Sequence, residues 1–78
     1  MNIMIFKTSV QGQRDLISIR PVMDILFGEK NWTFAFEDVD KILRVVSAVP
    51  AVAVVRHILM NNGFFCEELP YSLDDFSV

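Results

Sequence analysis

Two alternating segments separated by a short acidic turn constrain the fold of this chain most strongly. In residues 31–37 and again in residues 41–46, apolar side chains recur at every second position. A period of two is typical of a half-buried strand. The connection Asp38-Val39-Asp40 is short enough to make the two strands an antiparallel hairpin. One side of the hairpin is expected to carry Trp32, Phe34, Phe36, Leu43 and Val45, and the other Thr33, Ala35, Glu37, Ile42, Arg44 and Val46.

Helical patterns flank this hairpin. Residues 13–27 are predicted to form one helix with the apolar stripe Leu16, Ile19, Met23, Leu26 and Phe27. Pro21 falls inside this helix and is expected to bend it. Ser47 can cap a second helix with Pro50 in its first turn, and Gly63 supplies a left-handed stop after Asn62. The inner stripe of that helix is expected to be Ala51, Val55, Ile58 and Leu59, although the β-branched run 52–55 has poor helix propensity.

Two further strands complete the pattern, residues 3–10 and residues 64–69. The order is then βαββαβ. With right-handed crossovers this predicts an α+β, ferredoxin-like sandwich, in which a four-stranded antiparallel sheet of order 4-1-3-2 carries both helices on one face. We expect one domain over residues 1–69, followed by a C-terminal tail, residues 70–78.

Size and charge exclude several classes. Of the 78 residues, 53% are hydrophobic, which supports one core and leaves apolar side chains over for association. With a net charge of −3, the chain lacks the excess of basic residues that is typical of proteins that bind nucleic acid. No apolar run approaches the roughly 20 residues of a membrane span, and the start of the chain has no basic segment typical of a signal peptide. We therefore expect a cytoplasmic protein that binds neither nucleic acid nor membrane.

Four short stretches together resemble the heavy-metal-associated domains, the small copper and zinc carriers. They are Phe6-Lys7-Thr8, Pro21 with Asp24, residues 41–45, and Asn62-Gly63-Phe64. The resemblance implies the sandwich described above and would place two cysteine ligands for a soft ion at Gly12 and Asp15. Neither residue supplies a thiolate, so the chain looks like a branch without the metal motif, and we expect no metal and no cofactor.

The remaining reactive side chains favour structural roles. Cys66 is the one cysteine, which excludes an internal disulfide, and alternation places it inward as a small hydrophobe. Its neighbours Glu67 and Glu68 are expected to raise the pKa of its thiol. His57 is predicted to lie on the surface. Asp38 and Asp40 are expected to form an ordinary turn. No catalytic set can be assembled, so no enzyme is expected.

The bare face of the sheet is the strongest functional lead. Alternation assigns to it the candidate interface residues Ile5, Ile42, Arg44, Phe65 and Glu67. Contiguous exposed apolar surface usually marks an interface. Two alternatives stay open: the tail could cover this face with Tyr71, Leu73 and Phe76, or the edge of the strand at 31–37 could pair with another chain.

The sequence therefore predicts a small non-enzymatic module for protein interaction or self-association, with a homodimer or another protein as partner. Metal carriage through a site assembled between two chains from Cys66, His57 or Asp15 is one alternative. A small-molecule-binding regulatory domain is another, and it rests on fold analogy alone.

Overall fold

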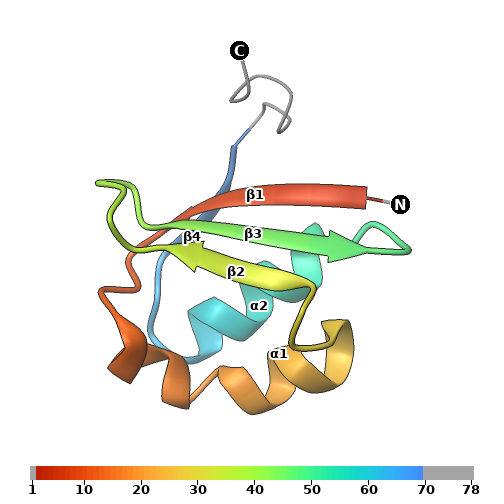
Figure 1. The fold of residues 1–78 in the computed structure, drawn as a ribbon, viewed down its shortest axis with the longest axis horizontal. Coiled ribbons are helices and arrows are strands. Elements are labelled where there is room, and N and C mark those ends of the chain that lie inside the picture. Colours follow the sequence, from red (N-terminus) through yellow and green to blue (C-terminus); the bar gives the residue numbers. More distant parts are fainter. Residues whose placement is uncertain (1, 70–78) are drawn as a thin grey trace.

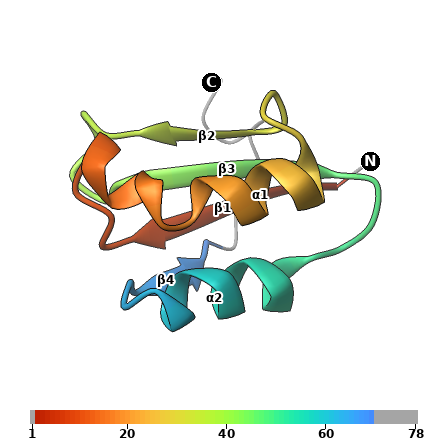
Figure 2. The same cartoon turned by 90° about the horizontal axis from the view of Figure 1, so that it is seen from below.

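The computed structural model describes residues 2–69 as a four-stranded antiparallel sheet with helices on one side. In chain order the elements are β1 (Asn2–Thr8), the 3₁₀ helix η1 (Gln13–Ile17), α1 (Arg20–Phe27), β2 (Trp32–Ala35), β3 (Ile42–Ser47), α2 (Val52–Asn61) and β4 (Cys66–Glu68). The strand order is β2-β3-β1-β4. Figures 1 and 2 show η1, α1 and α2 against the same face of the sheet. The predicted α+β architecture with a four-stranded antiparallel sheet is confirmed.

The two central strands carry most of the core. β1 pairs with β3 from Asn2↔Ser47 to Lys7↔Ile42, and its other edge pairs with β4. Phe6, Leu43 and Val45 on the helix side are fully buried, as alternation predicted. Central strands covered on one face by helices lose the most apolar surface to the core, so these positions contribute most to hydrophobic stabilisation. Within residues 2–69 no helix has the length and hydropathy needed to cross a membrane.

The predicted helix over residues 13–27 is wrong in one respect, because the structure divides it. η1 ends at Ile17, and α1 starts at Arg20 with Pro21 in its first turn. A proline ring would clash with the carbonyl four residues earlier, whereas the first turn of a helix tolerates it, so Pro21 begins a helix rather than bending one. Leu26 is 52% exposed, against prediction, because α1 packs through Met23 and Phe27 and Leu26 lies to one side of that line.

The start of the second helix also differs from prediction. Ser47 ends β3, and its Oγ accepts a hydrogen bond from Val49 N at 3.3 Å instead of capping α2. The residue before a proline disfavours helical backbone, so Val49 cannot join the helix and α2 begins only after Ala51.

The end of α2 is as predicted. Gly63 has φ +85°, Gly63 N–H donates to Met60 O and Phe64 N–H donates to Leu59 O, which is a Schellman motif. Val55, Ile58 and Leu59 on the inner side of α2 are buried as predicted, and so is Ala51, which precedes the helix.

Candidate functional site

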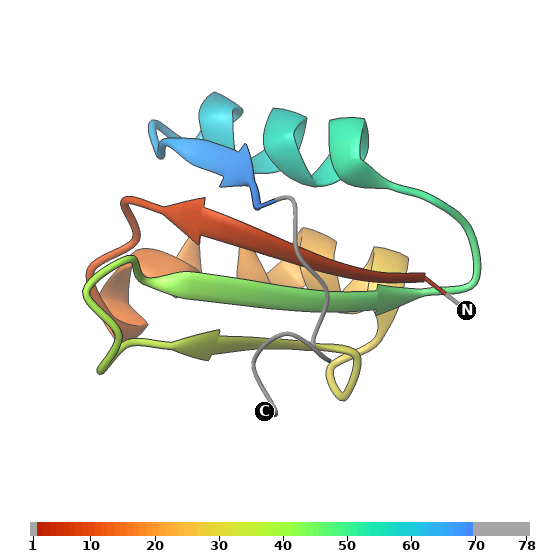
Figure 3. The same ribbon diagram turned by 90° about the horizontal axis from the view of Figure 1, so that it is seen from above.

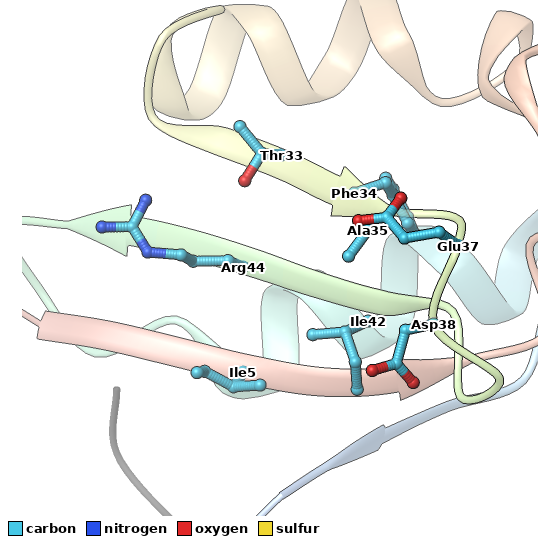
Figure 4. Close-up of a pocket in the computed structure, with 8 residues that line it drawn as sticks. All are labelled: Ile5, Thr33, Phe34, Ala35, Glu37, Asp38, Ile42 and Arg44. Atoms are coloured by element: carbon cyan, nitrogen blue, oxygen red, sulfur yellow. The ribbon is translucent and has the colours of Figure 1, made fainter. Parts of the chain in front are cut away.

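The helix-free face of the sheet contains a groove, which we call the sheet groove. It has a volume of about 290 Å³. Figure 3 views the strands from the side away from the helices, and Figure 4 shows the groove in close-up. Its lining comes from three adjacent strands and the turn between two of them: Ile5 from β1, Thr33, Phe34 and Ala35 from β2, Ile42 and Arg44 from β3, and Glu37 and Asp38 from the β2–β3 turn.

Strand register sets the arrangement of these side chains. Ile5 lies opposite Arg44 across β1 and β3, while Thr33 lies opposite Arg44 and Ala35 opposite Ile42 across β2 and β3. Directly opposed residues share a face and approach each other closely. The middle of the sheet groove is therefore apolar, formed by Ile5, Ala35 and Ile42. Arg44 lies toward one end and the two turn carboxylates lie at the other (Figure 4).

The charged groups at the ends differ in how they are engaged. Asp38 Oδ1 accepts a hydrogen bond from Asp40 N at 2.8 Å, so the acidic turn forms the predicted local bond. Asp40 also lies 3.6 Å from Lys7 Nζ. Within residues 2–69, Arg44, Glu37 and Asp38 form no ion pair. The sheet groove thus presents one cation and two anions that the described part of the chain leaves unneutralised.

The structure brings together three of the five predicted interface residues. Ile5, Ile42 and Arg44 line the sheet groove, with Ile5 3% exposed and the other two partly buried. Phe65 instead lines a second hollow with Arg56, Met60, Gly63, Phe64 and Cys66. Glu67 is exposed on β4 and lines neither. Phe65 differs because it precedes β4, which forms the opposite edge of the sheet from β2, one of the strands that line the sheet groove. The predicted tail cover by Tyr71, Leu73 and Phe76 lies outside the described residues.

Glu37 and Asp38 are not among the predicted interface residues. The signal for Glu37 was present, since it continues the outward phase of Thr33 and Ala35 beyond the end of β2. Asp38 carried no such signal, because its position depends on how the β2–β3 turn folds.

The outer edge of β2 is a second exposed feature. Val46 N–H donates to Asn31 O at 2.8 Å, and in an antiparallel ladder the hydrogen-bonded pairs alternate. The backbone groups of Trp32 and Phe34 are therefore directed away from β3, toward an edge that no other strand of residues 2–69 covers. β2 has only four residues, and short edge strands are a common protection against unwanted pairing.

The loop that the resemblance assigned to metal is held by its own hydrogen bonds. Asp15 Oδ2 accepts from Gln11 N at 2.9 Å, and Asp15 N–H donates to Gly12 O at 3.1 Å. Gly12 is extended, with φ −177°, and a Cβ there would meet nothing within 4 Å. Across residues 2–69 no three His, Cys, Asp or Glu side chains lie close enough together to hold a metal ion. Asp15 acts here as a loop anchor.

Cys66 and His57 lie in contrasting environments. Cys66 is 3% exposed, and burial raises the pKa of its thiol from 9.0 to about 11, with the charge of Arg56 opposing the rise. Burial, rather than the expected effect of Glu67 and Glu68, is thus the cause. His57 is exposed as predicted, and its Nε2 lies 2.9 Å from Asn61 Nδ2.

No family model, no curated protein and no solved structure gives a significant match to this chain.

Proposed function

We propose that this protein is a small non-enzymatic interaction module that binds its partner through the sheet groove. The observation that carries the proposal is the composition of the groove: an apolar middle of Ile5, Ala35 and Ile42, with Arg44 toward one end and Glu37 and Asp38 at the other. An apolar centre with charged groups at its margin is the usual anatomy of a protein interface. The apolar centre supplies affinity, and the charges set the orientation of the partner.

For the fold, we propose the ferredoxin-like class and a relationship to heavy-metal-associated domains that have no cysteine pair. The strand order β2-β3-β1-β4 and the helices on a single face support the first proposal. The position of Gly12 directly before η1 and of Asp15 within η1, soon after β1, supports the second, since the family's ligand loop follows its first strand.

Metal carriage is less well supported as a function. The thiol of Cys66 is buried, and with a pKa of about 11 it is protonated at neutral pH, whereas a metal ligand must be a thiolate. Asp15 is already engaged by Gln11 N–H. A metal site shared between two chains would therefore have to break the hydrogen bond of Asp15 to Gln11 N–H or expose Cys66 on β4.

Position-specific photocrosslinking of the full chain in its native cells tests the proposal. A crosslinking side chain would replace Thr33, which is exposed in the sheet groove, and in a control would replace Ile25, which is 83% exposed on α1. We expect one discrete protein adduct from position 33 that is absent from position 25. Equal adducts from both positions, or no protein adduct from position 33, would overturn the proposal.

A further inference from the structure

We propose that the partner bound in the sheet groove is a second copy of this chain, related to the first by a two-fold axis. This inference rests on the proposed function and names its partner. The argument is that the charge pattern of the groove is complementary to itself. A two-fold interface places one surface patch against the same patch, so every contact between two different positions occurs twice.

The charges fit this symmetry. Arg44 lies toward one end of the groove, and Glu37 and Asp38 lie at the other, with Ile42 and Ala35 between them (Figure 4). A two-fold axis that lies between the two sheets, parallel to them, and runs across the strands over Ile42 and Ala35 exchanges the two ends. Arg44 of each copy then meets the acidic turn of the other. A two-fold axis parallel to the strands would instead place Arg44 near Arg44 and one acidic turn near the other, and this repulsion between like charges disfavours that arrangement.

The internal ion pairing leaves these particular charges for the partner. Lys7, also a cation on this face, lies 3.6 Å from Asp40, so both are engaged within the chain. Arg44, Glu37 and Asp38 form no ion pair with any of residues 2–69. Each copy thus offers one cation and two carboxylates, and the symmetric contact brings a cation to each acidic turn.

The apolar contact lies at the centre of the same arrangement. Ile42 and Ala35 lie next to the axis and meet their own symmetry mates, whereas Ile5 beside them on β1 is 3% exposed and adds little contact area. Ile3 adds apolar surface farther along β1, where it is 46% exposed. Two sheets packed face to face in this way lie about 10 Å apart.

The dimensions of the sheet indicate a weak dimer. Four strands spaced by about 4.8 Å and the seven residues of β1 at about 3.3 Å each give a face of about 19 × 23 Å, or about 440 Å². A stable interface buries about 800 Å² per partner. We therefore expect a weak dimer in rapid exchange with monomer, populated at micromolar concentrations.

Charge reversal at each end gives the sharpest test, measured on the full chain by sedimentation across micromolar concentrations. Arg44→Glu makes both ends acidic. Glu37→Arg combined with Asp38→Asn makes the turn basic, and asparagine keeps an acceptor for Asp40 N–H. We expect each variant alone to dimerise at least about tenfold more weakly than wild type. An equimolar mixture of the two should form a heterodimer, because both end contacts are then complementary.

Matched controls separate this pairing from general charge effects and from misfolding. Arg14→Glu in η1 and Glu29→Arg after α1 reverse exposed charges on other elements and should leave the wild-type dissociation constant unchanged. Arg44→Gln removes the cation without adding repulsion and should weaken the dimer by a smaller factor than Arg44→Glu. Far-UV circular dichroism of each variant checks that it is folded.

A wild-type chain that stays monomeric at high micromolar concentration would overturn the inference. So would a mixture of the two reversed variants that fails to associate. These outcomes are distinct from failure of the proposed function. A crosslink from position 33 to a different protein would leave the interaction module standing with another partner. A crosslink from position 33 to residues 70–78 of the same chain would identify the tail as the occupant and overturn the second copy.

Discussion

The hydrogen bond between Trp32 and Asp24 joins β2 to α1 and gives a quantitative prediction. Trp32 Nε1 donates to Asp24 Oδ1 at 2.9 Å, and the Trp32 side chain is 6% exposed. Arg20 lies over the same ring, with its guanidinium carbon 5.5 Å from the centroid. Asp24→Ala would leave a buried indole N–H without its acceptor, at a cost of about 1–3 kcal/mol because the group has lost its hydration as well as its partner.

We expect a loss of about 2 kcal/mol for Asp24→Ala, which corresponds to a fall in Tm of about 8–16 °C for a domain of this size. Asp24→Asn keeps an oxygen acceptor and should cost about 1 kcal/mol or less. In the Trp32→Phe background there is no N–H to satisfy, so Asp24→Ala should cost little. The coupling energy from the double-mutant cycle is expected to be about 1–2 kcal/mol.

Urea unfolding followed by far-UV circular dichroism measures these differences. Trp32 is the one tryptophan, so fluorescence cannot follow the Trp32→Phe variants. Low micromolar protein keeps dimerisation from contributing to the apparent stability. A coupling energy near zero, or an Asp24→Asn variant as unstable as Asp24→Ala, would show that Asp24 does not stabilise the fold through the indole.

Three further predictions concern the core, the thiol and two glycines. Leu43→Ala, at a fully buried central position, should cost about 2–5 kcal/mol in urea unfolding, whereas Leu26→Ala, 52% exposed, should stay within about 1 kcal/mol of wild type. Because the pKa of Cys66 is raised in the folded state, its contribution to stability is complete below pH 9.0 and is lost as the pH rises through about 11. The difference in unfolding free energy between wild type and Cys66→Ala should therefore change by up to about 3 kcal/mol over that interval, and no change would contradict burial of the thiol. Gly63→Ala should cost about 1 kcal/mol because φ is +85°, while Gly12→Ala, extended and uncrowded, should be neutral or slightly stabilising, as thermal denaturation would show.

Sequence patterns predicted best where the structure depends on local periodicity. The alternation around Phe34 and Leu43 predicted the hairpin, its buried side and the outward positions of Ile42 and Arg44, because a strand places successive side chains on opposite faces. The end of α2 was predicted for a similarly local reason, since the positive φ at Gly63 is a property that glycine supplies directly.

The errors arose where competing local effects meet. Pro21 is compatible with either a bent helix or a new one, and the composition of residues 13–27 does not show which the backbone adopts. Ser47 is a good cap by type, but Pro50 delays the helix and leaves Ser47 in β3. In the groove, the contribution of Asp38 follows from the shape of a turn, which periodicity does not describe.

The central position of β1 has a consequence for how the chain acquires its structure during synthesis. β1 is made before its two neighbours, yet its partners are β3, starting at Ile42, and β4, starting at Cys66. An apolar segment containing Met4, Ile5 and Phe6 must therefore wait, unpaired, while about 40 further residues leave the ribosome. Closing such long loops is slow, so the sheet is expected to form late and nearly all at once. The nascent chain is then most prone to aggregate in the interval before β3 emerges.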